Sequence, residues 1–254
     1  MRLRDKIAVI TGASRGIGKE IALAYAREGA TVVLASRKAE QLEATAQEVQ
    51  AAGGRALAIP THTGHADQCA ALIDQTISAF GRVDVLVNNA ATNPHLGPLL
   101  TADAGQWQKT LEVNLLGYFW LSKRAAEAMQ QTGGGVIVNM ASVAGLQPMP
   151  MLGLYSVTKA AVIMLTKALA QELALHHIRV NAIAPGVVRT RFAQALWEND
   201  QVRERIEAST PLGRLAEPVE VAEAAVYLAS DGASYVTGHV LVVDGGGTIS
   251  GIVL

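Results

Sequence analysis

A tyrosine and a lysine stand four residues apart in the segment Tyr155-Ser156-Val157-Thr158-Lys159, at the start of an apolar-periodic stretch that runs to about His176. If the stretch is a helix, both side chains project from one face and lie one turn apart. A phenol in water titrates near pH 10, and an adjacent ammonium lowers its pKa by favouring the phenolate. Tyr155 is therefore a candidate general acid or base, although ordinary amphipathic helices also contain this spacing.

The sequence around this pair alternates short β-branched runs with longer helical patterns. Such alternation is typical of βαβ units and of a parallel sheet that is buried on both faces. It predicts an α/β fold with a doubly wound sheet of seven strands, and no long linker or internal repeat divides the chain. The predicted strands are Ile7–Ile10, Thr31–Ala35, Ala56–Ile59, Val83–Val87, Val136–Asn139, Arg179–Ile183 and Val240–Val243.

The first predicted strand leads into a glycine-rich loop, Thr11-Gly12-Ala13-Ser14-Arg15-Gly16-Ile17-Gly18, and a helical pattern follows to Arg27. Glycine at positions 12, 16 and 18 allows the backbone to approach a pyrophosphate and the helix to pack against the strand. The N-terminus of the helix adds free N–H groups and the positive end of its dipole. A tight turn without a ligand is the alternative, but the strand–loop–helix order favours a dinucleotide-binding loop.

The second predicted strand ends in Ala35-Ser36-Arg37-Lys38. This segment lacks the Asp or Glu that binds the free ribose 2′-hydroxyl in NAD-selective proteins. Instead, Ser36, Arg37 and the loop residue Arg15 offer hydrogen-bond donors and bidentate cations for a 2′-phosphate. A solvated helix start is the alternative explanation for Arg37 and Lys38. We predict NADP(H) as the cofactor in preference to NAD(H).

Polar side chains follow or interrupt later apolar elements. Asn88 and Asn89 end the fourth strand, where they either tie neighbouring strands together or border the cofactor. Ser142 follows the fifth strand, at the sheet edge where ligands bind, and its hydroxyl either holds a substrate oxygen or forms a turn. Asn114 lies in a helical pattern from Asp103 to about Gln131. If buried, its amide either bends the helix around a water or is a satisfied core group.

Residues 191–214 interrupt the strand–helix rhythm after the sixth strand. We expect a substrate lid there that excludes water from the reaction, with a surface helix as the alternative. The side chains expected beside it form a fairly large apolar pocket without a cation, which favours bulky neutral substrates over small keto acids. The expected pocket residues are His95, Leu146, Met149, Leu152, Phe192, Leu196 and Trp197.

The composition argues against several classes of function. The 254 residues are 50% hydrophobic and carry a formal net charge of −1 without a long basic run, so we expect no nucleic-acid or membrane partner. The one cysteine, Cys69, excludes an internal disulfide and fits a reducing compartment. The N-terminal apolar run is too short for a signal-peptide core, and Gly251-Ile252-Val253-Leu254 is no peroxisomal signal. We expect a cytoplasmic protein, and we predict no metal ligand.

Together, the glycine loop, Asn88-Asn89-Ala90, Asn114, Ser142, the Tyr155–Lys159 pair and Pro185-Gly186 resemble the short-chain dehydrogenase/reductase family over essentially the whole chain. The resemblance implies one Rossmann-type dinucleotide-binding domain over residues 1–254. It also implies that Tyr155 is the acid/base, that Ser142 positions the substrate oxygen, and that Asn114 anchors a water in a proton relay. Lys159 would lower the tyrosine pKa and bind the nicotinamide ribose. A homotetramer built on the helices that carry Asn114 and Tyr155 is a further implication.

The same resemblance implies where the cofactor lies. Val188 and Thr190 would hold the nicotinamide carboxamide. Two positions depart from the family pattern, because His62 stands where an aspartate usually binds the adenine amino group and Ala91 replaces a common glycine. The cofactor-binding residues predicted in this way are Gly12, Ser14, Arg15, Gly16, Ile17, Gly18, Ser36, Arg37, His62, Asn89, Ala90, Tyr155, Lys159, Pro185, Gly186, Val188 and Thr190.

Within the family, the chain is similar to NADPH-dependent carbonyl and retinal reductases at His62 and Gly64, in the segments 89–94 and 233–238 and at Leu196-Trp197. We therefore predict hydride transfer between NADP(H) and a ketone, aldehyde or secondary alcohol. A 3-oxoacyl-[acyl-carrier-protein] reductase has the same motifs, but the end of the Asn114 helix, Met129-Gln130-Gln131-Thr132, lacks a basic docking surface for an acidic carrier. A regulator that senses NADPH without catalysis is a third alternative. Such regulators tend to lose a catalytic residue, whereas this chain retains all four, which argues against this alternative.

Overall fold

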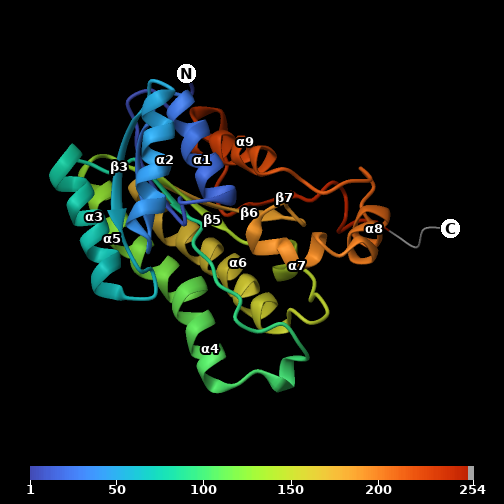
Figure 1. The fold of residues 1–254 in the computed structure, drawn as a ribbon. Coiled ribbons are helices and arrows are strands. Elements are labelled where there is room, and N and C mark those ends of the chain that lie inside the picture. The colour runs from blue at the N-terminus through green and yellow to red at the C-terminus, as the bar shows by residue number, and fades with distance from the viewer. Residues whose placement is uncertain (251–254) are drawn as a thin grey trace.

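The computed structural model describes residues 1–250, so the C-terminal segment 251–254 considered above lies outside the described residues. Seven parallel strands form one sheet in the order β3-β2-β1-β4-β5-β6-β7. Figure 1 shows this sheet between two layers of helices. The predicted doubly wound α/β fold is confirmed. The strands are β1 (Ile7–Thr11), β2 (Thr31–Ser36), β3 (Arg55–Pro60), β4 (Val85–Asn88), β5 (Gly135–Met140), β6 (Ile178–Pro185) and β7 (Val240–Val243).

Successive strand residues belong to opposite sides of the sheet. In β1, Ala8 and Ile10 belong to the core on one face, whereas Ile7 and Val9 belong to the core on the other. Because both faces are covered, the strands are continuous apolar runs without polar alternation. One face packs against α1 (Gly16–Arg27), α2 (Ala39–Ala51) and α9 (Pro218–Ala229); the other packs against α3 (Ala66–Phe80), α5 (Gly117–Gln131) and α6 (Gly153–Leu173).

The strand order reverses at β1, which pairs with β2 on one side and with β4 on the other. The loops that follow β1 and β4 therefore lead to opposite layers and leave a crevice between them. In open α/β sheets, ligands bind in this crevice, outside the carboxyl ends of the strands. The loops after β1, β4, β5 and β6 surround this position.

The long helix predicted from Asp103 to Gln131 has three parts. It begins as α4 (Ala104–Leu111), where Asp103 and Gln106 form a reciprocal capping box. A π-helical turn, Glu112–Leu116, then precedes α5. Such turns insert an extra residue into the helix and occur frequently at functional sites. Asn114 lies in the middle of this turn.

The helix predicted around Tyr155 is α6, and a 3₁₀ turn extends it to His176. Gly153–His176 is apolar and long enough to span a membrane, and 44% of its most apolar window is buried inside the protein. Its inner side packs on β6, and Val157 and Met164 are exposed on its surface. Packing on one side and exposed apolar residues together account for the high hydropathy of α6.

The segment predicted as a lid is helical. After β6, it comprises a 3₁₀ turn (Arg191–Ala193), α7 (Gln194–Trp197) and α8 (Asp200–Ser209). These elements form the orange region to the right of the sheet in Figure 1. The lid segment thus follows directly from the carboxyl end of β6, beside the crevice.

Candidate active site

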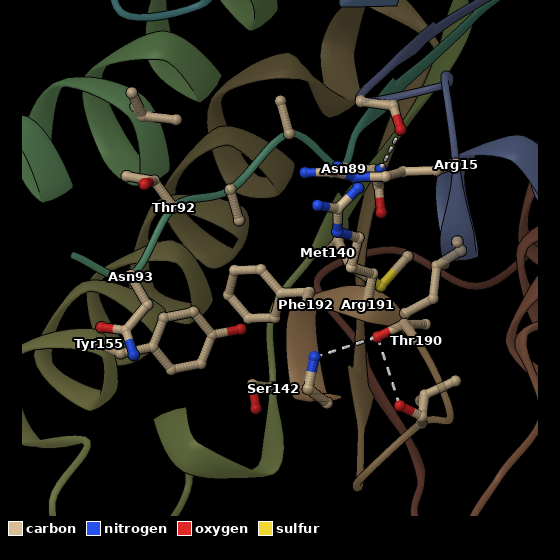
Figure 2. Close-up of a pocket in the computed structure, with 18 of the residues that line it drawn as sticks. Arg15, Asn89, Thr92, Asn93, Met140, Ser142, Tyr155, Thr190, Arg191 and Phe192 are labelled. Atoms are coloured by element: carbon tan, nitrogen blue, oxygen red, sulfur yellow. Dashed lines mark hydrogen bonds between the residues drawn. The ribbon is translucent and has the colours of Figure 1, made fainter. Parts of the chain in front are cut away.

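A cavity of about 670 Å³ occupies the crevice at the carboxyl ends of the strands. Its wall combines the glycine loop with the ends of β2 to β6 and with the first turns of the segment 191–214. Figure 2 shows the central part of this wall. The predicted residues that line the cavity are Gly12, Ser14, Arg15, Gly16, Ile17, Ser36, Arg37, His62, Asn89, Ala90, Ser142, Met149, Leu152, Tyr155, Lys159, Pro185, Gly186, Val188, Thr190, Phe192 and Leu196.

The glycine loop has the backbone that a phosphate cradle requires. Gly12 and Gly16 adopt φ values of 67° and 57°, a left-handed conformation that disfavours side chains. Gly18 does not line the cavity. Any larger residue at this position would place its Cβ against the backbone oxygen of Gly12. Asn89 holds the loop through a hydrogen bond from Nδ2 to the oxygen of Thr11 at 2.9 Å. Gly18 thus provides close packing between helix and loop.

The predicted adenosine end contains an unsatisfied polar atom. The Ser36 hydroxyl is buried on the cavity wall and has no hydrogen-bond partner among the described residues. Since buried polar groups are normally paired, this hydroxyl is free to bind a ligand oxygen. Arg37 and Lys38 line the same end. These groups and the glycine cradle fit a dinucleotide that carries an additional phosphate.

His62 and Lys109 form a pair that sequence reasoning missed. The Nδ1 atom of His62 accepts a hydrogen bond from the Gly64 N–H at 3.0 Å, and Nε2 lies 3.1 Å from the Lys109 ammonium nitrogen. Burial, followed by the charge of Lys109, lowers the pKa of His62. Lys109 comes from α4, so only the tertiary fold brings it to the end of β3. A neutral imidazole and a cation therefore occupy the position where the family pattern has a carboxylate.

The cavity wall is strongly cationic. No Asp or Glu lines it among the described residues, and unpaired positive charge in a low-dielectric cleft attracts anions. This imbalance contrasts with the whole chain, whose formal net charge is −1. The lining cations are Arg15, Arg37, Lys38, Lys109 and Arg191, and the buried Lys159 also lines the wall.

Tyr155 and Ser142 lie together on the cavity wall, as expected from the sequence. Figure 2 shows both side chains opening into the cavity, and the Phe192 ring lies 5.8 Å from the Tyr155 ring between centroids. Burial raises the pKa of Tyr155 to about 12, while the neighbouring Ser142 hydroxyl acts in the opposite direction. The Ser142 hydroxyl also accepts a hydrogen bond from the Ala144 N–H at 3.1 Å. Tyr155 is therefore a protonated phenol at neutral pH.

Lys159 is almost completely buried beneath Tyr155. Its ammonium nitrogen lies 5.5 Å from the centre of the Tyr155 ring and donates a hydrogen bond to the Met140 oxygen at 2.6 Å. Burial lowers the pKa of Lys159 to about 7. Burial disfavours the charged form of both groups, so the net shift of the Tyr155 pKa is upward, opposite to the direction expected from the Lys159 charge alone. The pair is close in space, but both members favour their neutral forms.

Asn114 does not line the cavity. Its Nδ2 donates to the Thr92 oxygen at 2.9 Å and to the Thr158 hydroxyl at 3.3 Å, and its Oδ1 accepts from the Thr92 N–H at 2.8 Å. Of the two alternatives for a buried amide, these contacts correspond to the satisfied core group. The contacts fix the loop after β4 against α6, next to Tyr155.

The structure does not place three predicted pocket residues on the cavity. His95 is buried elsewhere, with Nε2 3.0 Å from the Thr101 hydroxyl, and Leu146 is absent from the wall. Trp197 turns back along the lid and donates a hydrogen bond from Nε1 to the Thr190 oxygen at 2.9 Å. Arg191, which the expected set of pocket residues did not include, also lines the cavity. In each of these loop segments, the local course of the backbone decides which side chains face the cavity. The order of residues in the sequence does not reveal this course.

Comparisons with known proteins place this geometry in a family. A family model described as enoyl-(acyl carrier protein) reductase matches residues 12–248. A dehydrogenase/reductase SDR family member 4 from Oryctolagus cuniculus is 38% identical over 244 residues, which cover 96% of this chain and 94% of the relative.

Solved structures agree with the sequence relatives. A dehydrogenase from Beutenbergia cavernae that contains NADP at low occupancy has a TM-score of 0.93 and 40% identity, with 98% of each chain covered. A 7α-hydroxysteroid dehydrogenase in complex with NADH and a 7-oxo bile acid has a TM-score of 0.93 and 36% identity, with 97% of this chain and 95% of the other covered. With the glycine cradle and with Ser142, Tyr155 and Lys159 at one cavity, these matches show that the chain belongs to the short-chain dehydrogenase/reductase family of oxidoreductases.

Proposed function

We propose that this protein is an NADPH-dependent reductase of ketones and aldehydes, reversible as a secondary-alcohol dehydrogenase. The main support is the composition of the cavity wall, where cations and the unpaired Ser36 hydroxyl meet no carboxylate among the described residues. NADPH carries an additional phosphate on the adenosine ribose, whereas NAD-selective sites use an acidic residue at this point. Relatives bind either cofactor, since the structures above contain NADP in one case and NADH in the other.

The proposed reaction uses Ser142 and Tyr155 to hold the carbonyl oxygen of the substrate. A bound NADPH supplies the hydride that reduces the carbonyl carbon. Tyr155, whose pKa is raised to about 12, is protonated at pH 7 and donates a proton to the oxygen as negative charge develops there. The same raised pKa makes Tyr155 a poor base at neutral pH. Reduction is therefore favoured at neutral pH, and alcohol oxidation should increase as the pH rises.

We propose that Lys159 supplies the proton that restores the Tyr155 hydroxyl after Tyr155 has donated its own proton to the substrate. Its pKa of about 7 means that the ammonium and the amine are both populated at neutral pH, and its nitrogen lies beneath the Tyr155 ring. We also retain the family roles in which Lys159 binds the nicotinamide ribose and Asn114 belongs to a proton relay. Phe192 covers the Tyr155 ring from the lid side and would exclude water from the reacting atoms. Residues 191–214 are accordingly proposed to be a substrate lid.

A screen of carbonyl compounds tests this proposal. NADPH oxidation is followed by absorbance with free aromatic ketones and aldehydes, and NADP⁺ reduction is followed with secondary alcohols. Each assay is repeated with NADH or NAD⁺. We expect turnover with neutral carbonyls and a clear preference for NADPH. NADPH binding without oxidation of any carbonyl would instead support a regulator that only senses the cofactor.

A second candidate is 3-oxoacyl-[acyl-carrier-protein] reduction, which the carrier-protein description of the matching family model favours. Comparing an acetoacetyl-carrier thioester with a free aromatic ketone separates the two candidates. A much higher kcat/KM for the carrier thioester would support the second. The exposed end of α5 around Gln130 and Gln131 offers no cation to an acidic carrier, which favours the free ketone.

We further propose a homotetramer built on α5 and α6. Exposed apolar side chains on these helices and on the preceding π turn support it, since clustered apolar residues on a surface often mark an interface. These residues are Leu116, Phe119, Val157 and Met164. Light scattering tests the assembly, with Met164→Glu expected to shift a tetramer to smaller species. A monomeric wild-type protein would contradict the proposal.

A further inference from the structure

The first turn of the lid carries a cation to which no role has been assigned. Arg191 lines the cavity, and Figure 2 shows its side chain inside it. Three other arginines of this region, Arg189, Arg203 and Arg214, form ion pairs with Glu217, Asp200 and Glu220. Within residues 1–250, Arg191 pairs with no carboxylate, and the wall around it has none. A guanidinium in this environment is suited to bind an anion that enters the cavity.

The backbone of this turn is held against the glycine loop. A Cβ built on Gly16 would lie 3.4 Å from the Thr190 methyl carbon, so the two segments are in contact. Thr190 caps the turn by accepting a hydrogen bond from the Ala193 N–H at 3.4 Å. Trp197 ties α7 to the same residue through the hydrogen bond from its indole N–H to the Thr190 oxygen. Arg191 therefore leaves the backbone beside the loop that would hold a diphosphate.

Neighbouring residues of the turn face different parts of the cavity. In Figure 2, the Arg191 side chain extends toward the part where Arg15 and Asn89 lie, whereas Phe192 lies toward Tyr155. The 5.8 Å separation of the Phe192 and Tyr155 rings supports this placement of Phe192. A single short turn thus links the phosphate side of the cavity to the side with the proposed proton donor.

We propose that Arg191 binds the diphosphate of the cofactor from the lid side and that this contact holds Phe192 over Tyr155. The inference rests on the proposed function, because it takes NADPH as the anion. The glycine loop and the N-terminus of α1 form the opposite wall, where backbone N–H groups and the helix dipole favour phosphate oxygens. Bidentate hydrogen bonds from the guanidinium would complete the enclosure of the diphosphate. Cofactor binding then shapes the substrate pocket through two consecutive residues.

Isothermal titration calorimetry tests the contact with two probes. NADPH contains the diphosphate, whereas adenosine 2′-monophosphate presents the adenosine and its 2′-phosphate alone. Arg191→Met should weaken NADPH binding by about 10- to 100-fold, as expected for a lost charge-assisted hydrogen bond, and Arg191→Lys should recover part of the loss. Binding of adenosine 2′-monophosphate should stay unchanged. The matched control, Arg189→Met, removes an ion-paired arginine two positions away and should leave both affinities unchanged.

The coupling to Phe192 is tested with saturating NADPH and an aromatic ketone. Arg191→Met and Phe192→Ala should each raise the KM for the ketone, and the double variant should show less than the product of the two effects. Independent effects would overturn the coupling, and unchanged NADPH affinity in Arg191→Met would overturn the diphosphate contact. Equal losses for both calorimetric probes would also overturn it. Failure of the wild-type protein to bind NADPH would instead refute the proposed function itself.

Discussion

The ammonium nitrogen of Lys159 lies 5.5 Å from the centre of the Tyr155 ring; Lys159 is buried, and Tyr155 is half-buried on the cavity wall. Burial lowers the pKa of Lys159 to about 7 and raises the pKa of Tyr155 to about 12. Each group is therefore held toward its neutral form. A protonated phenol above a lysine that readily exchanges protons is well arranged to deliver a proton during carbonyl reduction.

Replacing Lys159 with Met should change how stability depends on pH. The pKa of Lys159 is about 7 in the folded protein and has an ordinary value of 10.5, so between these values the unfolded chain binds more protons. This term makes the wild-type protein more stable as the pH rises through that window. Lys159→Met removes the term. The free energy of unfolding of the variant relative to wild type should therefore fall steadily from pH 7 to pH 10.

Urea denaturation at several pH values in that window measures the effect. Lys167→Met is the matched control, because Lys167 is exposed on the same helix, two turns farther on. The control should show no such trend. A constant difference between Lys159→Met and wild type across the window would contradict the burial of an ionisable Lys159.

Arg37 is expected to select the cofactor. Arg37→Met should weaken NADPH binding by about 10- to 100-fold, because a charge-assisted, bidentate contact to the 2′-phosphate is lost. NADH has no 2′-phosphate, so its affinity should change by less than about threefold. Fluorescence titration of both cofactors gives the ratio directly. Equal losses for the two cofactors would show that Arg37 does not bind the 2′-phosphate.

Asn114→Ala should destabilise the fold as well as the site. The substitution leaves the N–H and the carbonyl of Thr92 without their side-chain partner. We expect the free energy of unfolding to fall by about 2–4 kcal/mol, the cost of buried groups left unpaired. Asn93→Ala is the matched control in the adjacent loop, because the Asn93 Oδ1 forms no hydrogen bond with described residues. Similar losses in both variants would contradict this account of Asn114.

Strands and motifs were predictable because they depend on local pattern. All seven predicted strands overlap those observed, with ends that differ by a few residues. β4 starts at Val85 rather than at Val83, and the Asp84 just before it accepts a hydrogen bond from the Ile7 N–H at 2.8 Å and donates its own N–H to the Ile7 oxygen. Such contacts connect residues far apart in the chain. Their partners cannot be identified from periodicity.

Side-chain direction and the effect of burial were not predictable. His95 finds a hydrogen-bond partner away from the cavity, and the Trp197 indole turns to the backbone of Thr190, whereas Arg191 and Lys109 enter the cavity from a turn and from α4. A polar residue beside an expected pocket turns toward whichever partner the fold offers. The upward direction of the Tyr155 pKa shift was not predictable for a related reason, because spacing reveals proximity to Lys159 but not the desolvation of both groups. The position of Arg191 directly after Thr190, which was predicted to bind the cofactor, was the sequence feature that could have indicated a cavity residue.

The most direct test of the account is to compare NADPH binding and turnover in Tyr155→Phe. The variant keeps the ring that packs against Phe192 and loses only the hydroxyl, so the NADPH dissociation constant should stay within about threefold of wild type. Loss of the proton donor should lower kcat for ketone reduction by about 10²- to 10⁴-fold. Near-normal kcat in this variant, with NADPH binding intact, would contradict the proposal that Tyr155 delivers the proton.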